Sequence, residues 1–307
     1  MKLDPAAACV ADAYRASAFG LVWQADLPLT RFRSCESPAP VPDVRIGRVG
    51  ALPQRAGGVK INRGWIYADG IRFVWEEEVA FDLRGAERID YAPGPAWSGA
   101  LPDAFYSSVA ALTLAWRGLL PFHASTVAID GRAVLIAGAA GVGKSTLAAA
   151  LTGQGARWLA DDLSAISQDA AGRFHAHPGR TAARLHAAVC TWIAATERRP
   201  AYADPRGKRL VGLADAANSE ATELAGMVVL GLEAGPLAAI HRPAMLTRHM
   251  FRPRWLAQLP NASLRRLQVL SLASKLPVIA VPVAEMRDAA AFRAQGEAVL
   301  ALIRSIL

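Results

Sequence analysis

Cysteine is scarce in this chain of 307 residues. Its three cysteines, Cys9, Cys35 and Cys190, are odd in number and far apart in the sequence. A disulfide framework needs paired cysteines, and a zinc site needs ligands at short, regular spacings. The sequence therefore argues against both kinds of site.

Long apolar runs are also missing. The nearest candidate for a membrane span, residues 109–122, is interrupted by Arg117 and is too short to cross a bilayer. The first residues carry Asp4 and Asp12 among alanines and show no signal-peptide pattern. We therefore expect a cytoplasmic protein with no membrane partner.

Charged residues make up only 20% of the chain, against 53% hydrophobic residues, which excludes a disordered polymer and allows a full core. The net charge of +8 would suit a nucleic acid, but no nucleic-acid-binding motif accompanies it, and we expect no such partner. A mild concentration of arginine comprises Arg242, Arg248, Arg252, Arg254, Arg265 and Arg266. These side chains either form a solvated basic surface or bind an acidic peptide or a transferring phosphate.

One stretch fits the pattern G-x-x-x-x-G-K-[ST] at every position. It comprises Gly138, Ala139, Ala140, Gly141, Val142, Gly143, Lys144, Ser145 and Thr146. A short apolar run, 133–137, precedes it and helix formers, 144–152, follow, which is the strand–loop–helix setting of a P-loop. The backbone N–H groups of such a loop cradle phosphates, its lysine reaches the outer phosphates and its serine hydroxyl binds magnesium. The stretch predicts a site for ATP and Mg²⁺.

Two adjacent acids, Asp161 and Asp162, follow a single helix and a short strand-like segment, 157–160. Two carboxylates beside a triphosphate can divide two tasks, because one can bind Mg²⁺ while the other accepts a proton from an attacking hydroxyl. The alternative is a turn or helix-capping pair, for which aspartate is also common. We take both as catalytic and metal-binding candidates without dividing the two roles between them.

His123 stands just before the strand that leads into the P-loop hairpin. Asp130-Gly131 between apolar alternating residues predicts a hairpin, so the strand after His123 should pair with the P-loop strand. This pairing would bring the imidazole near the phosphates. A basic turn, 204–209, supplies a further candidate, Lys208, which either completes a phosphate clamp or lies on an exposed loop.

The order of elements predicts two domains. Residues 1–100 contain strand-like pieces at 20–24, 44–49, 60–68, 71–75 and 79–83, with a hairpin at Ala68-Asp69-Gly70. We expect a β-rich domain there with a docking role for a peptide, and a catalytic domain over 101–307. In the latter we expect helices at 103–116, around 181–196 and 244–258, and at 288–306, with strands at 164–167, 225–232 and 276–283.

His123-Ala-Ser125, the P-loop and the segment from Gly155 to Asp162 together resemble the catalytic core of HPr kinase/phosphorylase. The resemblance implies an α/β fold with a mixed sheet and helices, similar to phosphoenolpyruvate carboxykinase, preceded here by the small β-rich domain. It also implies that Lys144 binds phosphate, that Ser145 or Thr146 assists the metal, that Asp161 and Asp162 supply the metal contact and general base, and that His123 orients the acidic pair.

The first 180 residues are more similar to the HPr-kinase-like proteins of lasso-peptide and related gene clusters. The similarity includes segments 14–29 and 116–125, whereas the Glu-x-Arg-Gly segment of the HPr enzymes has no counterpart here. This resemblance implies a serine kinase that acts on a peptide or small protein, such as a lasso-type precursor peptide. The sequence leaves the oligomeric state open, a homo-oligomer included.

Two other functions stay open at this stage. One is a nucleotide-dependent regulatory ATPase or switch, and the other is a kinase that acts on a small molecule. A GTPase is disfavoured because the sequence has no Asn-Lys-x-Asp motif for guanine.

Overall fold

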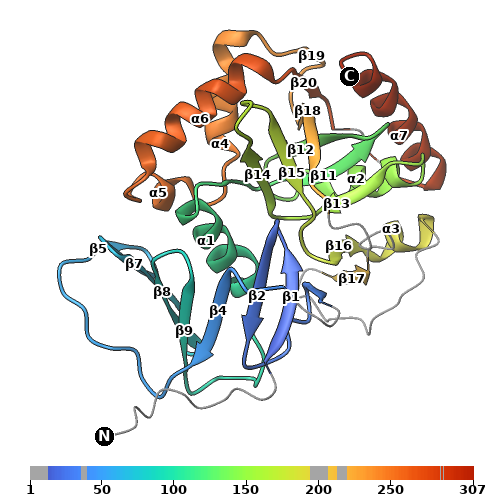
Figure 1. Cartoon of the computed structure of the whole chain (residues 1–307). Coiled ribbons are helices and arrows are strands. Elements are labelled where there is room, and N and C mark those ends of the chain that lie inside the picture. Colours follow the sequence, from blue (N-terminus) through green and yellow to red (C-terminus); the bar gives the residue numbers. More distant parts are fainter. Residues whose placement is uncertain (1–12, 36–39, 194–206, 213–219, 284, 286) are drawn as a thin grey trace, which may run out of the picture. The chain divides into compact units, whose positions relative to one another are not determined.

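The computed structural model describes residues 13–35, 40–193, 207–212, 220–283, 285 and 287–307 (Figure 1). By its contacts the chain divides into two compact units. The first unit holds Met1–Ser17 and Leu21–Pro102, and the second holds Ala18–Gly20 and Asp103–Leu307. Each unit is built around its own β-sheet, and the architecture is mixed α/β, as the sequence predicted at that level.

The first unit is a nine-stranded sheet in the order β3-β1-β2-β4-β9-β8-β7-β6-β5. Its strands are β1 (Tyr14–Ala18), β2 (Leu21–Ala25), β3 (Arg33–Ser34), β4 (Val44–Arg48), β5 (Val59–Ile61), β6 (Gly64–Tyr67), β7 (Gly70–Trp75), β8 (Val79–Arg84) and β9 (Arg88–Pro93). Strand β4 runs parallel to β2 and β9, whereas the pairs from β9 to β5 are antiparallel. Alternate residues face the core, as in β2, where Leu21, Trp23 and Ala25 are buried.

The first unit contains one hairpin that the sequence predicts and one that it does not. The predicted turn before Gly70 is present, because Tyr67 pairs with Gly70 across β6 and β7. The single strand expected over 60–68 is wrong, since it folds back on itself as β5 and β6. Asn62 has φ +43° in that turn, a left-handed conformation that asparagine tolerates better than most residues.

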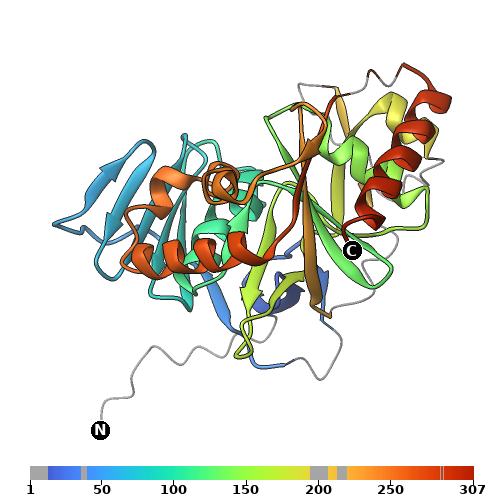
Figure 2. The same cartoon turned by 90° about the horizontal axis from the view of Figure 1, so that it is seen from above.

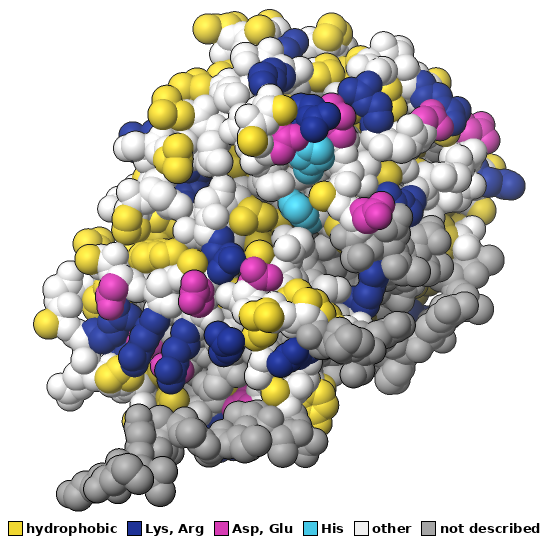
Figure 3. Space-filling view, in the orientation of Figure 1, with side chains coloured by type: hydrophobic (Ala, Val, Ile, Leu, Met, Phe, Trp, Pro, Cys, Tyr) yellow, Lys and Arg dark blue, Asp and Glu magenta, His cyan; other side chains and the backbone are white. Residues whose placement is uncertain are grey.

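A row of charges crosses the sheet of the first unit. Asp82 on β8 is fully buried and stands opposite Arg72 of β7 on one side and Asp90 of β9 on the other. Arg55 Nη1 lies 3.0 Å from Asp82 Oδ1, and Arg88 Nε lies 2.8 Å from Asp90 Oδ1. Figure 3 shows Lys and Arg side chains with interspersed Asp and Glu over these strands. Arginine thus neutralises two carboxylates that face each other across neighbouring strands.

The second unit has a larger sheet in the order β10-β14-β15-β18-β12-β11-β13, with β20 beside β18 and β19 beside β20. Its strands are β10 (Leu120–Phe122), β11 (Ser125–Ile129), β12 (Arg132–Gly138), β13 (Arg157–Ala160), β14 (Ser164–Gln168), β15 (Phe174–His177), β18 (Thr222–Leu230), β19 (Gly235–Pro236) and β20 (Val278–Val281). Strand β18 runs parallel to β12 and β20, and the other neighbours are antiparallel. A separate antiparallel pair joins β16 (Ala182–His186) and β17 (Lys208–Gly212).

The helices of the second unit lie on both sides of its sheet (Figure 2). They are the π-helical turn η1 (Phe105–Val109), α1 (Ala110–Trp116), α2 (Lys144–Thr152), α3 (Ala187–Trp192), the 3₁₀ turn η2 (Ala239–His241), α4 (Arg242–Arg248), α5 (Pro253–Leu256), α6 (Ala262–Lys275) and α7 (Ala289–Arg304). Helices α2 and α7 pack together over β11, β12, β18 and β20 to form the main core. Within the described residues, none of these helices is both long and apolar enough to cross a membrane.

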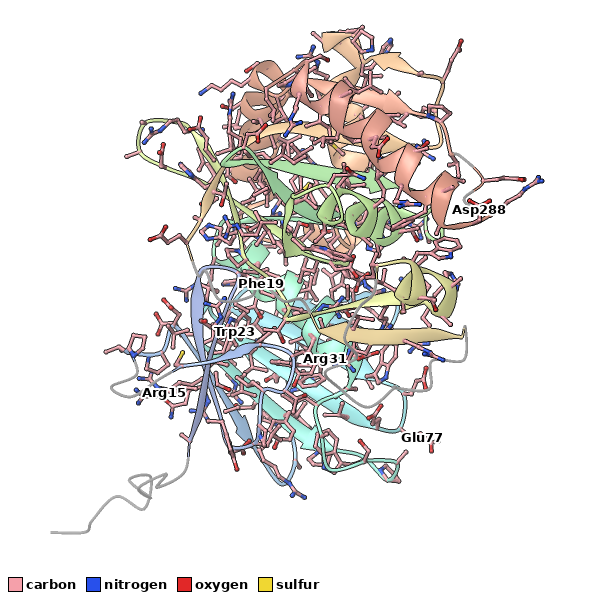
Figure 4. The ribbon with its side chains drawn as sticks, turned by 90° about the vertical axis from the view of Figure 1, so that its right-hand side faces the viewer. Arg15, Phe19, Trp23, Arg31, Glu77 and Asp288 are labelled. Carbon is pink, nitrogen blue, oxygen red and sulfur yellow. The ribbon has the colours of Figure 1, made fainter. Side chains whose placement is uncertain are left out.

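The amphipathic helix expected at the end of the chain is present as α7. Asp288, labelled at one end of this helix in Figure 4, accepts hydrogen bonds from the N–H groups of Ala290 and Ala291 and so caps it. Phe292, Val299 and Ile303 are buried on one face, as predicted, while Ile306 is only partly buried and follows the helix.

Two expected helices differ from the structure. The region 181–196 was predicted to be helical, but 182–186 is strand β16 and only α3 is helical; residues 194–196 lie outside the described residues. The expected helix at 244–258 is divided into α4 and α5 by a short bend at 249–252. Arg252 has φ +53° in that bend, and Pro253 begins α5. A helix cannot continue through the left-handed residue, and proline favours a new start.

Candidate functional site

The glycine-rich loop connects β12 to α2, in the predicted strand–loop–helix order. The hairpin before it is also present, because Ile129 of β11 pairs with Arg132 of β12 and Asp130 and Gly131 both have positive φ. Gly138 has φ +150°, and a Cβ there would lie 2.8 Å from Val142 Cγ1. The start of the loop therefore requires glycine, and the backbone can turn tightly into α2.

Lys144 lies buried over its own loop. Its Nζ donates to the carbonyl oxygens of Gly138 at 3.2 Å and Ala139 at 3.1 Å. Burial lowers the pKa of Lys144, the negative charges of Asp162 and Asp161 oppose that shift, and the positive charge of Lys208 adds to it. The ammonium group thus belongs to one charge cluster with both aspartates and Lys208.

Lys208 begins strand β17 and is half-buried. The basic turn to which the sequence assigned it cannot be judged as a whole, because residues 204–206 lie outside the described residues. Its positive charge contributes to the lowering of the Lys144 pKa. Its role as a phosphate ligand stays a prediction.

Asp161 is buried, with 1% of its surface exposed, and both carboxylate oxygens are engaged. Ser125 Oγ donates to Oδ1 at 2.7 Å, and the Arg184 backbone N–H donates to Oδ2 at 3.3 Å. The Asp161 carbonyl also accepts from Arg180 Nη2 at 3.1 Å. These bonds hold Asp161 in place beneath the site.

Asp162 is oriented differently, although it is the next residue. Its backbone has φ +67°, and about a third of the side chain is exposed. Arg180 Nη2 donates to Oδ2 at 2.9 Å, and His123 Nδ1 lies 3.5 Å from Oδ1. Partial burial favours a higher pKa for Asp162, but the charges of Arg180 and Lys144 outweigh it and lower the pKa. The carboxylate is therefore ionised and accessible.

His123 connects β10 to β11 and packs edge-on against Phe251, with 5.6 Å between the ring centroids. Burial lowers its pKa, opposed by the charge of Asp162, so the imidazole is neutral at neutral pH. The expected approach of His123 to the acidic pair is present for Asp162.

A cavity of about 360 Å³ opens in front of the loop. Gly138, Ala139 and Ala140 line it from the loop, His123 lines it from the side, and residues 248–252 line it opposite. Two backbone hydrogen bonds hold this last segment against the sheet: His123 N–H donates to the His249 carbonyl and Phe251 N–H to the Pro121 carbonyl, both at 2.8 Å. A stretch more than a hundred residues away in sequence thus completes the site.

Two arginines of that segment line the cavity, Arg248 and Arg252. The guanidinium of Arg252 donates to Ser108 Oγ at 2.8 Å and 3.1 Å, which fixes its position. Sequence analysis had grouped these residues with other arginines without separating them. The structure distinguishes this pair, because it faces the glycine-rich loop.

Sequence analysis assigned no separate role to Ser125, Arg180 or His249. Ser125 is part of the segment His123-Ala-Ser125, so the sequence already indicated that it lies near the site. Arg180 follows a Pro-Gly pair after a strand, and no one-dimensional pattern marks it as a partner of Asp162. These contacts depend on the long-range pairing of strands, which a single sequence does not display.

The residues at this site fit a magnesium ion bound with a nucleotide. No group of three His, Cys, Asp or Glu side chains suited to a metal occurs among the described residues. Magnesium bound through one or two protein oxygens takes its other ligands from phosphates and water. Ser145, in the first turn of α2, and the carboxylates of Asp161 and Asp162 remain the candidate protein ligands.

Acid should destabilise the second unit through two histidines. Burial lowers the pKa of both His177 and His249 to about 4. Between about pH 6.5 and pH 4 the unfolded chain therefore binds protons that the folded chain does not, so stability falls as the pH falls. We expect a loss on the order of 2 kcal/mol for each histidine between pH 7 and 5 in urea unfolding.

The variants His177→Gln and His249→Gln should each flatten this pH dependence. His186→Gln is the matched control, because His186 is exposed. An unchanged slope in both core variants would contradict the assignment.

Residues 106–195, which include His123, the glycine-rich loop and both aspartates, match the family model described as SynChlorMet cassette protein ScmC. No curated protein matches the chain. Among solved structures, the Hpr(Ser) kinase/phosphatase from Coxiella burnetii aligns over 60% of this chain and 94% of its own length, with 14% sequence identity and a TM-score of 0.34. The family match spans under a third of the chain and the structural similarity is low, so the residues of the site carry the functional argument.

Proposed function

We propose that this protein is an ATP·Mg²⁺-dependent kinase that transfers the γ-phosphoryl group to a serine hydroxyl of a peptide or small protein. The observation that carries the proposal is the position of Asp162. Its ionised carboxylate is held by Arg180 and His123, interacts with the charge of the P-loop lysine, and is partly exposed. Phosphoryl transfer to an alcohol needs a loop that binds the nucleotide and an oriented carboxylate that accepts the proton of the alcohol.

The glycine-rich loop would bind the phosphates through its backbone N–H groups and the start of α2. Lys144 would exchange its bonds to the Gly138 and Ala139 carbonyls for phosphate oxygens. Arg248 and Arg252, on the opposite wall of the cavity, would face the charge that develops on the transferred group. Bound magnesium would neutralise charge on the phosphates, with Ser145 and an aspartate as its protein ligands.

The structure favours a division of roles between the two aspartates. Asp162 is the candidate general base, because it is accessible and its oxygens lie beside His123 and Arg180. It would accept the proton of the serine hydroxyl as the oxygen attacks phosphorus, and ADP would leave. Asp161 is the candidate for the metal side, where its fixed and buried charge would act on magnesium and on Lys144.

The acceptor is proposed to be a ribosomally made peptide, of the lasso-precursor kind that the sequence resemblance implies. A docking role for residues 1–100 belongs to the same proposal. Action in the cytoplasm, where ATP and magnesium are present, also follows from it.

A transfer assay tests this function directly. The full chain is incubated with ATP and Mg²⁺ and either the precursor peptide encoded beside its gene or HPr, and the products are measured by mass spectrometry. We expect one phosphate on a serine of the precursor peptide, and none with Lys144→Ala, because loss of the ammonium removes charge stabilisation at the outer phosphates. Arg132→Gln, at an exposed residue at the start of β12, serves as the control variant.

Two other results would contradict the proposal. ATP hydrolysis without labelling of either acceptor would favour a nucleotide-dependent switch. Labelling of a small molecule but of neither polypeptide would favour a metabolite kinase.

A further inference from the structure

A second hollow, of about 610 Å³, lies between α4, α5 and α6 of the second unit. Most of its lining is apolar, with Met250, Leu256, Val269 and Leu270 among the contributors. We call this hollow the α4–α6 groove. Its volume falls within the range of sites that bind small molecules or peptide side chains.

The groove adjoins the P-loop cavity. Arg248 and Met250 line both hollows. Arg248 therefore stands between them, at the end of α4. A chain that lies in the groove and passes Arg248 reaches the cavity lined by His123 and the start of the glycine-rich loop.

The charge around the groove has one sign. None of the residues that line it is acidic, and Arg248, Arg265 and Arg266 do line it. The sequence from 234 to 284 contains no Asp or Glu, while it contains six arginines and one lysine. Figure 3 likewise shows hydrophobic and basic side chains, without acidic ones, over α5 and α6. A ligand that complements this surface carries negative charge.

Helix α6 also carries apolar side chains that stay exposed in the structure. Leu264, Leu267 and Leu270 are 56%, 63% and 53% exposed and recur every third residue along one side. The buried side of the helix carries Val269, Leu272 and Ala273 instead. Exposed leucines grouped along one side of a helix, beside an apolar hollow, are typical of a surface that binds a protein segment.

We propose that the α4–α6 groove binds a segment of the acceptor peptide in which acidic residues alternate with apolar ones, and that this contact directs the serine toward the P-loop cavity. The inference rests on the proposed kinase function and names the class of acceptor. Apolar side chains of the peptide would enter the groove, and its carboxylates would meet Arg266 and Arg248. The exposed leucines of α6 and the apolar lining favour a peptide as the ligand. An RNA would bind mainly through its phosphates, which make no contact with apolar side chains.

Binding can be measured with a designed probe. The probe is a fluorescein-labelled peptide with one serine, leucine at every third or fourth position, and glutamate between the leucines. Two companions replace every glutamate with glutamine or with lysine. Fluorescence anisotropy with the full chain and a non-hydrolysable ATP analogue should show affinity at least about tenfold higher for the glutamate peptide than for the glutamine peptide, and a marked loss of that advantage in high salt.

Two groove variants locate the binding. Arg266→Glu should weaken binding of the glutamate peptide by about tenfold and improve binding of the lysine peptide, because it reverses a charge on the groove. Leu270→Gln should weaken the glutamate peptide by about fivefold or more, because it removes apolar contact area. Arg293→Glu and Leu302→Gln on α7 are the matched controls, since both residues are exposed and lie on another helix.

The outcomes separate this inference from the proposed function. If peptides are phosphorylated but Arg266→Glu and Leu270→Gln leave both binding and peptide KM unchanged, the groove inference is wrong and the kinase function stands. If the probe binds as expected but no acceptor is phosphorylated, the groove inference stands and the kinase proposal fails. A dimer in sedimentation that Leu270→Gln dissociates, or an RNA oligonucleotide that displaces the probe and binds more tightly, would overturn the choice of a peptide.

Discussion

Asp162→Asn is expected to lower phosphoryl transfer by at least about a hundredfold while nucleotide affinity stays near normal. Asparagine keeps the shape of the side chain and can still contact Arg180, but it cannot take the proton of the attacking hydroxyl. Single-turnover transfer to the peptide and equilibrium binding of an ATP analogue are the two measurements. Because the charges of Arg180 and Lys144 keep the pKa of Asp162 low, the wild-type rate should not fall through this group between pH 8 and 5.

Asp161→Asn is the informative comparison for that result. Asp161 accepts hydrogen bonds from Ser125 and from the Arg184 backbone, so an amide in its place points two hydrogens toward one of these donors. Transfer should again fall by about a hundredfold or more, but here with a measurable loss of stability. Near-normal transfer by Asp162→Asn, with a loss confined to Asp161→Asn, would reverse the proposed roles of the two residues.

Asp82→Ala should cost the first unit about 3–5 kcal/mol of unfolding free energy. Asp82 is fully buried and contacts Arg55 at 3.0 Å and Arg72 at 3.3 Å, so its loss deprives two largely buried guanidinium groups of a buried carboxylate and leaves Arg55 with only the exposed Asp69. Removal of one partner of a buried ion pair is among the most damaging single substitutions. Urea unfolding followed by tryptophan fluorescence would report it, since Trp23 lies in the core of this unit.

Two variants test whether charge is the cause. Asp82→Asn keeps the volume and removes only the charge, so most of the loss should persist in it. Glu76→Gln breaks the exposed ion pair with Arg63 and should change stability by less than about 1 kcal/mol. Equal effects of Asp82→Ala and Glu76→Gln would show that the row of charges across β7, β8 and β9 does not stabilise the fold as proposed.

The local part of the site could be predicted from the sequence. The apolar run before Gly138 and the helix formers after Gly143 became β12 and α2, because both signals act over neighbouring residues. The hairpin at Asp130 and Gly131 was equally local. The spacing from helix to strand to Asp161 also placed the acidic pair correctly after β13.

Long-range pairing accounts for most of what was missed. Residues 182–186 are alanine-rich and suggested a helix, yet they pair in register with Lys208–Gly212, and the sheet overrides helix propensity. Helix α6 was not predicted, because its leucines occur on both the buried and the exposed sides and leave no clear helical period. Asp161 and Asp162 have different partners, and these come from segments distant in the sequence, so residue types alone do not predict the difference.

The assignment of Ala18–Gly20 to the second unit has a practical consequence for dividing this chain into its parts. Phe19, labelled in Figure 4, is fully buried and donates its backbone N–H to the Pro178 carbonyl at 2.7 Å. Its ring also occupies the space beside Gly179, next to Arg180, which holds Asp162. A chain that begins near residue 103 would thus lack the Phe19 ring, which packs beside Gly179, the residue before Arg180. The proposed docking role of residues 1–100 is better tested by surface substitutions, because a truncated chain would also lose this packing, which is unrelated to the peptide.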